Sequence, residues 1–470
     1  MVAPTMPPSP PSSSTTTTTT PKNLSVSSET PAQPAHQPLP LQQIQKEKNI
    51  VALQMCMVGM VTGMTMMMPQ NQPMAAEIMP TATPAQVGFV LARASSIGSL
   101  FEFLLNPLMN ALGDKYGRRP IFVFSFSALA VLRAVAYFKR KSLSMLSLNL
   151  ILTRGLDTII FTNIRASLTD MLSGEDIAFA GPRLAAAAGV AVIVGPPVSL
   201  GITRLTGSHT LPLVAASCVA AYCAFTCCSK LEETLLPKNA KELSLTAASP
   251  LSFIELLRSS PAIAKLMTVS LIQTLFDGRN VADTDFAFQR SELGWSKEES
   301  GQFVIVAGFK ILLGGIIGKQ LIKYMGIRYI TSWSNAVNCL ASSLLVMAPT
   351  WSFYIMFVLA FGDRKRDGVE SMLTDLGTEK GFGRGRIASA LVNWRSIANM
   401  IAPLLFTNLY AWGVRQKKRT GNQYYASAHH ISCCVLSVVA QLVYNRLSTR
   451  EIDHALAASE RIKAAKLKKD

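Results

Sequence analysis

Ionisable residues lie inside long apolar stretches of this sequence, and the clearest are Glu102, Arg154, Asp157, Lys310 and Arg395. A charged side chain in hydrocarbon costs about 2.5–3.5 kcal/mol on insertion scales, so such residues normally face a partner or a water-filled cavity. Arg154 and Asp157 are three residues apart, which places them on one helix face where they are able to pair. The two carboxylates are candidates for proton exchange, and Arg154 or Arg395 for attracting an anion. Structural pairing between helices is the alternative for each residue.

Two further apolar stretches carry unusually dense charge. Residues 362–368 read Gly-Asp-Arg-Lys-Arg-Asp-Gly, and residues 277–285 contain Asp277, Arg279, Asp283 and Asp285. Five adjacent charges cannot all face one side of a helix. Either these helices are broken beside an aqueous cavity, or the residues lie outside the membrane-spanning segments.

The elements that carry these residues are long apolar segments. The chain has 470 residues, of which 49% are hydrophobic and 16% are charged, and its mean hydropathy is +0.29. Its apolar residues gather in stretches of roughly twenty, the length that crosses a hydrocarbon core of about 30 Å. The composition predicts an all-α, multi-pass integral membrane protein with twelve helices. Their expected positions are 49–68, 86–111, 120–138, 143–171, 184–206, 211–229, 262–282, 301–323, 328–348, 351–376, 387–411 and 429–446.

The segments between and around these spans divide the chain. Residues 1–46 are rich in Pro, Ser and Thr and poor in large apolar residues, which predicts a disordered tail. A polar stretch at 230–261 separates six spans (47–229) from six more (262–447), and a basic tail follows at 448–470.

The net charge of +17 gathers near span ends and in the last residues. This distribution is typical of cytoplasmic loops and places both termini in the cytoplasm. Residues 139–141 and 415–419 are basic segments that would then face outward. We find no zinc-finger spacing or interleaving of aromatic and basic residues, so we expect no nucleic-acid partner.

Metal and cofactor chemistry has weak support. The eight cysteines lack CxxC spacing, and we expect neither a disulfide framework nor a metal site. Seven methionines between Met55 and Met68 would suit copper(I), but Met is also ordinary packing material. No P-loop is present, and no cofactor is expected.

One short loop between the second and third spans carries a specific motif. Residues 112–120 read Leu-Gly-Asp-Lys-Tyr-Gly-Arg-Arg-Pro, which resembles the loop signature of the major facilitator superfamily, although Asn110 replaces its first Gly. Gly117 permits a tight turn, and the arginines favour the cytoplasmic headgroups. The residues that match are Gly113, Asp114, Gly117, Arg118 and Arg119. The resemblance implies a conformational gate in which Asp114 lies against the start of helix eleven, here near Arg386.

Two other segments support the same resemblance. Residues 318–328 look like a second copy of the loop, with Lys323 in place of the acid, which indicates two related halves. Gly195 and Pro196 open a segment similar to the G-P-x-x-G-G element of the family's antiporters, where a Pro kink and small residues let helices pack closely. Small-residue packing without such a role is the alternative. The layout over residues 48–447 is most similar to tetracycline-resistance-type drug:proton antiporters and their eukaryotic relatives.

The resemblance implies two six-helix halves that move a small organic solute by alternating access. It favours proton-coupled export, and Glu102, Arg154, Asp157, Lys310 and Arg395 fall on spans that line the central pathway in the family. We expect a monomer whose partners are the solute, protons and the lipid bilayer. An importer or uniporter of the same fold, and a receptor or scaffold that no longer transports, are the alternatives.

Overall fold

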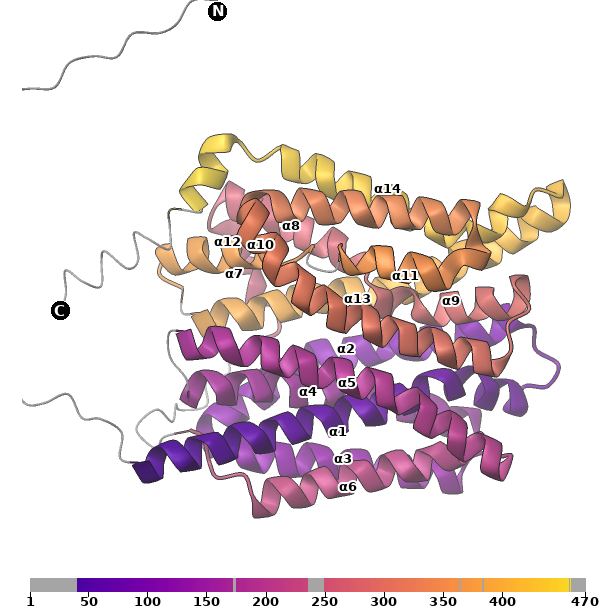
Figure 1. The fold of residues 1–470 in the computed structure, drawn as a ribbon, viewed down its shortest axis with the longest axis horizontal. Helices are drawn as coiled ribbons and strands as arrows, with labels where there is room; N and C mark the ends of the chain where they lie inside the picture. Colours follow the sequence, from indigo (N-terminus) through magenta and orange to yellow (C-terminus); the bar gives the residue numbers. More distant parts are fainter. Residues whose placement is uncertain are drawn as a thin grey trace, which may run out of the picture. The chain divides into compact units, whose positions relative to one another are not determined.

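The computed structural model describes residues 40–171, 175–235, 249–362, 365–382, 384–455 and 457. Residues 44–470 form one compact unit, whose described part is built from helices without strands (Figure 1). The predicted N-terminal tail falls mostly outside the described residues, as do residues 236–248 of the polar stretch and residues 456 and 458–470 of the basic tail.

The first half of the compact unit contains six long helices, which are coloured indigo to magenta in Figure 1. Helix α2 begins with a capping box, in which Thr83 and Gln86 satisfy each other's backbone N–H groups. Buried side chains such as Leu53, Phe122, Phe126 and Ile160 form the largest apolar core. The helices are α1 (Pro40–Ile78), α2 (Pro84–Tyr116), α3 (Arg118–Phe138), α4 (Leu143–Met171), α5 (Glu175–Thr206) and α6 (Leu211–Ser229).

The second half is built from shorter and interrupted helices. Helix α10 opens with a second capping box, between Ser296 and Glu299. The elements are α7 (Phe253–Arg258), α8 (Pro261–Leu275), α9 (Gly278–Glu292), α10 (Lys297–Met347), η2 (Pro349–Trp351), α11 (Ser352–Ala360), α12 (Asp367–Glu379), α13 (Arg384–Thr420), η3 (Gln423–Ser427) and α14 (Ala428–Asn445).

Twelve spans account for these elements, which confirms the predicted fold class. Nine helices of the described residues are long and apolar enough to cross a membrane. The other three spans are α8 with α9, the part of α10 after Gly326, and α11 with α12. Two of these three are interrupted at the charge-rich stretches, between α8 and α9 and between α11 and α12.

Some helices extend beyond their predicted ends. Helix α1 continues ten residues past the expected end at 68, through Pro69 and Pro73. Its polar extension is satisfied within the protein, because Gln70 Nε2 donates to Ser199 Oγ at 3.0 Å and Gln72 Nε2 to the Asp283 carbonyl at 3.3 Å. The apolar pattern ends before these residues, and only the tertiary partners explain why the helix continues.

The two halves repeat one unusual backbone turn. Gly117, between α2 and α3, has φ 100° and ψ 162°. Gly326, at the equivalent place within α10, has φ 77° and ψ 165°. This conformation is essentially restricted to glycine. The shared turn supports the prediction that residues 318–328 are a second copy of the loop.

Candidate functional site

A buried carboxylate joins the two halves at mid-helix. Glu102 of α2 is only 3% exposed. Its Oε1 accepts a hydrogen bond from Ser396 Oγ of α13 at 3.3 Å, and its Oε2 lies 3.5 Å from Arg279 Nη2 of α9. Glu102 comes from the first half and both partners come from the second. A change in the charge of this one group therefore acts directly on the interface between the halves.

Helix α9 supplies more polar contacts to the first half. Arg154 Nη2 of α4 donates to Asn280 Oδ1 at 3.3 Å, and Ser95 Oγ of α2 donates to Asp283 Oδ2 at 2.9 Å. Asn280 also donates to Asn399 Oδ1 of α13 at 2.9 Å. We define the central network as the residues that make these contacts: Ser95, Glu102, Arg154, Arg279, Asn280, Asp283, Ser396 and Asn399.

The predicted Arg154–Asp157 pair does not form among the described residues, because Arg154 reaches across to Asn280 instead. Asp157 is 9% exposed, and its Oδ1 makes no hydrogen bond. The buried Arg133 of α3 interacts electrostatically with Asp157, while Arg133 Nη1 donates to the Ala216 carbonyl at 3.1 Å. Asp157 is therefore a buried acid with spare hydrogen-bonding capacity, held inside the first half.

The other two predicted pathway residues lie outside the central network. Arg395 of α13 pairs with Glu370 of α12, with 2.7 Å between Nη1 and Oε1. Lys310 of α10 interacts electrostatically with Asp277. Structural pairing is thus the arrangement found for Arg395.

Four residues connect the interruptions of the two broken spans. Asp277 caps the N-terminus of α9, where it accepts from the N–H of Gly278 at 3.1 Å. Arg366, just before α12, lies 3.1 Å from Asp277. Lys365 Nζ donates to the Phe276 carbonyl at 3.3 Å. We call this arrangement, made by Phe276, Asp277, Lys365 and Arg366, the break bridge.

The loop motif forms a compact charged cluster around Arg118. This buried guanidinium contacts Asp114, and its Nε lies 3.2 Å from Asp170 Oδ2 of α4. Glu233 accepts from the N–H groups of Arg118 and Arg119, at 2.8 and 3.1 Å. Glu233 thereby occupies the N-terminus of α3, where a carboxylate is favoured.

The position of Asp114 against the start of helix eleven stays a prediction. Among the described residues, its ion pair is with Arg118. Near the start of α13, Arg386 pairs with Glu255 of α7. Asp114 is thus held within its own loop by the arginine four residues later.

The halves also meet closely through glycines of α5 and α10. A Cβ atom added to Gly308 would lie 2.9 Å from Ile193 Cγ1, and one added to Gly189 would lie 3.3 Å from Leu312 Cβ. At the ends of these helices, Arg204 and Glu298 form a looser pair at 3.9 Å. These contacts run from the middle of α5 and α10 to one end of the bundle. We call this end, which carries the turn after α5, the far end.

The residues Gly195 and Pro196 lie within α5, which continues as a helix through both. A Cβ atom on Gly195 would lie 2.1 Å from Thr65 Oγ1 of α1, so only glycine permits this approach. Close helix packing, the simpler of the two sequence interpretations, is what this segment provides.

Several members of the site are absent from the sequence-based candidates. Arg133 lies in an apolar span, as Arg154 does, and could have been found by the same criterion. The uncharged members of the network could not be found in this way, because uncharged polar residues are common in spans. They are Ser95, Asn280, Ser396 and Asn399. The sequence shows Arg279 and Asp283 as charged residues of the stretch 277–285. The side of the helix on which each side chain lies depends on where α9 begins.

Two bundles of six spans, joined by buried polar contacts between their centres, define a polytopic membrane transporter. Residues 50–403 match the family model of the Major Facilitator Superfamily. The chain belongs to this superfamily, and it is a transporter of small molecules rather than an enzyme.

Two of the curated proteins that are similar to it are tetracycline resistance proteins. The class C tetracycline resistance protein of Escherichia coli is 26% identical over 316 residues, which cover 67% of this chain and 78% of that protein. The class D tetracycline resistance protein of Salmonella ordonez is 24% identical over 361 residues, covering 74% and 86%.

Solved structures share the fold at low sequence identity. The human organic anion transporter MFSD10 (TETRAN) has a TM-score of 0.65 at 15% identity, covering 85% of this chain and 99% of that one. A D-xylose-proton symporter has a TM-score of 0.65 at 12% identity, covering 84% and 96%.

Proposed function

We propose that this protein exports a small organic solute in exchange for protons. The observation that carries the proposal is the contact of Glu102 with Arg279 and Ser396 across the two halves. Two relatives are named for tetracycline resistance, and a protein of the same fold is named as an organic anion transporter. We take tetracycline-like and anionic organic molecules as the substrate class.

The chemistry of the central network supports exchange of a proton for a solute. An ionised Glu102 holds Arg279 at 3.5 Å. Protonation removes the charge of Glu102 and so leaves Arg279 and Arg154 in excess over Asp283. The network then favours an anionic or electron-rich solute, while loss of the inter-half ion pair favours separation of the halves.

Alternating access requires the halves to part at the far end. The glycine contacts between α5 and α10 are made only while that end is closed, and their loss must be offset by contacts at the other end. We propose that the Arg118 cluster supplies part of that second set, with residues 47–229 and 262–447 rocking as units.

We propose further that both termini face the cytoplasm and that the protein acts as a monomer. The far end then faces away from the cytoplasm. Single cysteines at Lys115 and at Lys139, two exposed positions at opposite ends of the bundle, test this orientation. A membrane-impermeant maleimide added to intact cells should label position 139 alone, and labelling of position 115 alone would reverse the orientation.

The direct test uses purified protein in liposomes with an imposed pH gradient. Tetracycline and fluorescein, a fluorescent organic anion, serve as the probes. We expect the gradient to accelerate the flux of at least one of them, and Glu102→Gln to remove that acceleration. Asp453→Asn, an exposed carboxylate after α14, is the matched control and should behave as wild type.

Each other outcome corresponds to another function. Solute flux that does not depend on the pH gradient would favour a uniporter. Solute flux only in the direction opposite to export would favour an importer. Binding of a probe without flux under any gradient would favour a receptor or scaffold.

A further inference from the structure

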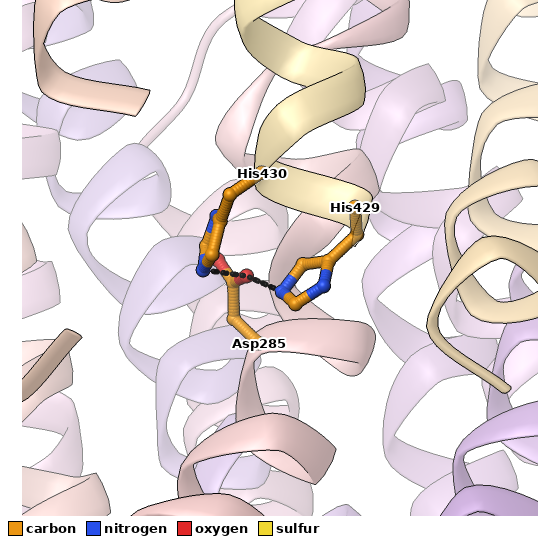
Figure 2. A group of neighbouring side chains, drawn as sticks. All are labelled: Asp285, His429 and His430. Atoms are coloured by element: carbon orange, nitrogen blue, oxygen red, sulfur yellow. Dashed lines mark ion pairs between the residues drawn. The ribbon is translucent and has the colours of Figure 1, made fainter. Parts of the chain in front are cut away.

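A cluster of two histidines and one carboxylate lies in the second half, apart from the central network. Asp285 of α9 faces His429 and His430, which open α14 (Figure 2). Asp285 Oδ1 lies 3.4 Å from His429 Nε2 and 3.8 Å from His430 Nε2. Asp285 follows Asp283 by two residues, so on a helix with about 100° per residue the two acids point to nearly opposite sides. Asp283 contacts the first half, and Asp285 contacts α14.

Three polar atoms of this cluster are buried without a hydrogen-bond partner. His429 is fully buried, and neither of its ring nitrogens makes a hydrogen bond of normal geometry, although the backbone of Ala426 is near. Asp285 Oδ1 is also without a hydrogen-bond partner. A buried polar group without a partner costs about 1–3 kcal/mol. Two of these atoms, His429 Nε2 and Asp285 Oδ1, face each other at 3.4 Å, and His430 Nε2 lies 3.8 Å from the same carboxylate oxygen, an arrangement that suits a shared cation.

The surroundings of the cluster are aromatic. The ring of Phe288 lies 5.2 Å from that of His429 and 5.5 Å from that of His430, and the ring of Tyr410 lies 5.6 Å from His429. This shell fixes the imidazoles and excludes water from most of their surface. The Asp285 side chain remains 19% exposed, which leaves an entry for an ion.

We propose that Asp285, His429 and His430 bind one Zn²⁺ ion. Their ligand atoms all lie within 4.8 Å of one another. Tetrahedral zinc, with bonds of about 2.0–2.1 Å, places its ligand atoms roughly 3.3 Å apart, so small side-chain rotations complete the site. Two imidazoles with one carboxylate suit zinc rather than Mg²⁺ or Ca²⁺, and the fourth position is open to water.

The bound ion would cross-link α9 to α14 at one end of the second half. Helix α9 also carries Arg279, Asn280 and Asp283 of the central network. Zinc would therefore hold in place the helix that presents these groups to the first half. The proposal is independent of the solute and of the direction of transport.

The test measures zinc on the full-length chain after chelation and addition of Zn²⁺ alone. We expect one tightly held zinc per chain, a raised thermal midpoint, and an X-ray absorption spectrum with nitrogen and oxygen ligands. Asp285→Asn, His430→Gln and His429→Phe should each weaken binding at least about tenfold. The Phe variant keeps an aromatic ring in the aromatic shell, so its loss of zinc is separable from loss of folding.

His209→Gln and His454→Gln are the controls, because both histidines lie next to a glutamate elsewhere in the chain. They should bind zinc as the wild type does. Three results would overturn the proposal: no stoichiometric zinc on folded wild-type protein, sulfur ligands in its spectrum, or loss of zinc only in a control variant. A cluster that binds only protons would give the first of these results.

Discussion

Arg366 and Asp277 form a 3.1 Å ion pair between the interruptions of two membrane spans. Lys365 completes the arrangement by donating to the carbonyl of Phe276, two residues before the start of α9. Each broken helix exposes unsatisfied N–H or carbonyl groups, which are costly in a membrane unless partners satisfy them. The break bridge supplies those partners from charged side chains.

Removing one partner of this pair should destabilise the protein. Asp277→Asn removes the carboxylate that pairs with Arg366 at 3.1 Å, at a cost of about 1–3 kcal/mol, between the values for exposed and buried pairs. The double exchange Asp277→Arg with Arg366→Asp should recover less than half of the loss, because a helix N-terminus disfavours a cation.

Thermal unfolding in detergent measures this effect, with Glu255→Gln as the control. Glu255 pairs with Arg386 on the surface, and both side chains are more than half exposed, so its removal should cost under about 1 kcal/mol. Equal losses for the two single variants would show that the break bridge adds no particular stability.

Arg118 should be the least replaceable residue of the loop motif. Its side chain is 8% exposed and is shared by Asp114 and Asp170. Arg118→Ala leaves two carboxylates without their cation and should cost about 3–5 kcal/mol. Arg118→Lys should recover only part, since an ammonium lacks the planar fork that serves two acids.

The exposed Lys115 of the same loop gives the comparison. Lys115→Ala should change stability by less than about 0.5 kcal/mol. The free energy of unfolding of the three variants is compared by denaturation. A wild-type value for Arg118→Ala would show that the charged cluster does not stabilise the protein.

The α5–α10 glycine contact should control which end of the transporter is closed. Gly308→Val places methyl groups where Ile193 already lies within 3.0 Å of the missing Cβ, at both Cγ1 and the backbone nitrogen. We expect the far end to open. Spin labels on Arg204→Cys and Glu298→Cys, now paired at 3.9 Å, should report a longer distance.

Gly201 on α5 provides the matched control, because no atom lies within 4 Å of an added Cβ. Gly201→Ala should leave the label distance unchanged. A Gly308→Val protein with the wild-type distance would mean that the contact does not limit closure at the far end.

The apolar lengths predict the twelve spans, and the loop motif at 113–119 predicts the family, because both depend on local sequence. The partners within the site depend on tertiary structure. Arg154 has Asp157 three residues away on its own helix, yet it reaches Asn280, 126 positions later. Likewise Asp285 and the adjacent His429 and His430 are far apart in sequence, so only the packing of α9 on α14 brings them together.

The broken spans show the same limit from another side. The charges of residues 277–285 and 362–368 signal that an ordinary span is impossible there. The pairing of these charges depends on how the two helix interruptions face each other in the folded protein. The local sequence does not determine that arrangement. The direction of Arg279 and Asp283 follows from the start of α9 at Gly278.

Asp157 should contribute to proton coupling from inside the first half. It is buried with an unused carboxylate oxygen, so protonation need not break a hydrogen bond at that atom. Asp157→Asn should lower gradient-driven flux at least about tenfold, a range typical of losing one proton-transfer group. Thermal unfolding of the variant provides the control for folding, and wild-type flux with wild-type pH dependence would remove Asp157 from the pathway.

Proton flux accompanying solute flux tests the central claim most directly. A pH-sensitive dye trapped in the liposomes measures proton flux. The concentration of tetracycline or fluorescein in the medium measures solute flux at the same time. We predict that solute moving one way drives protons the other way in the wild type, and that Glu102→Gln moves solute without protons. Unchanged proton exchange in Glu102→Gln would contradict it.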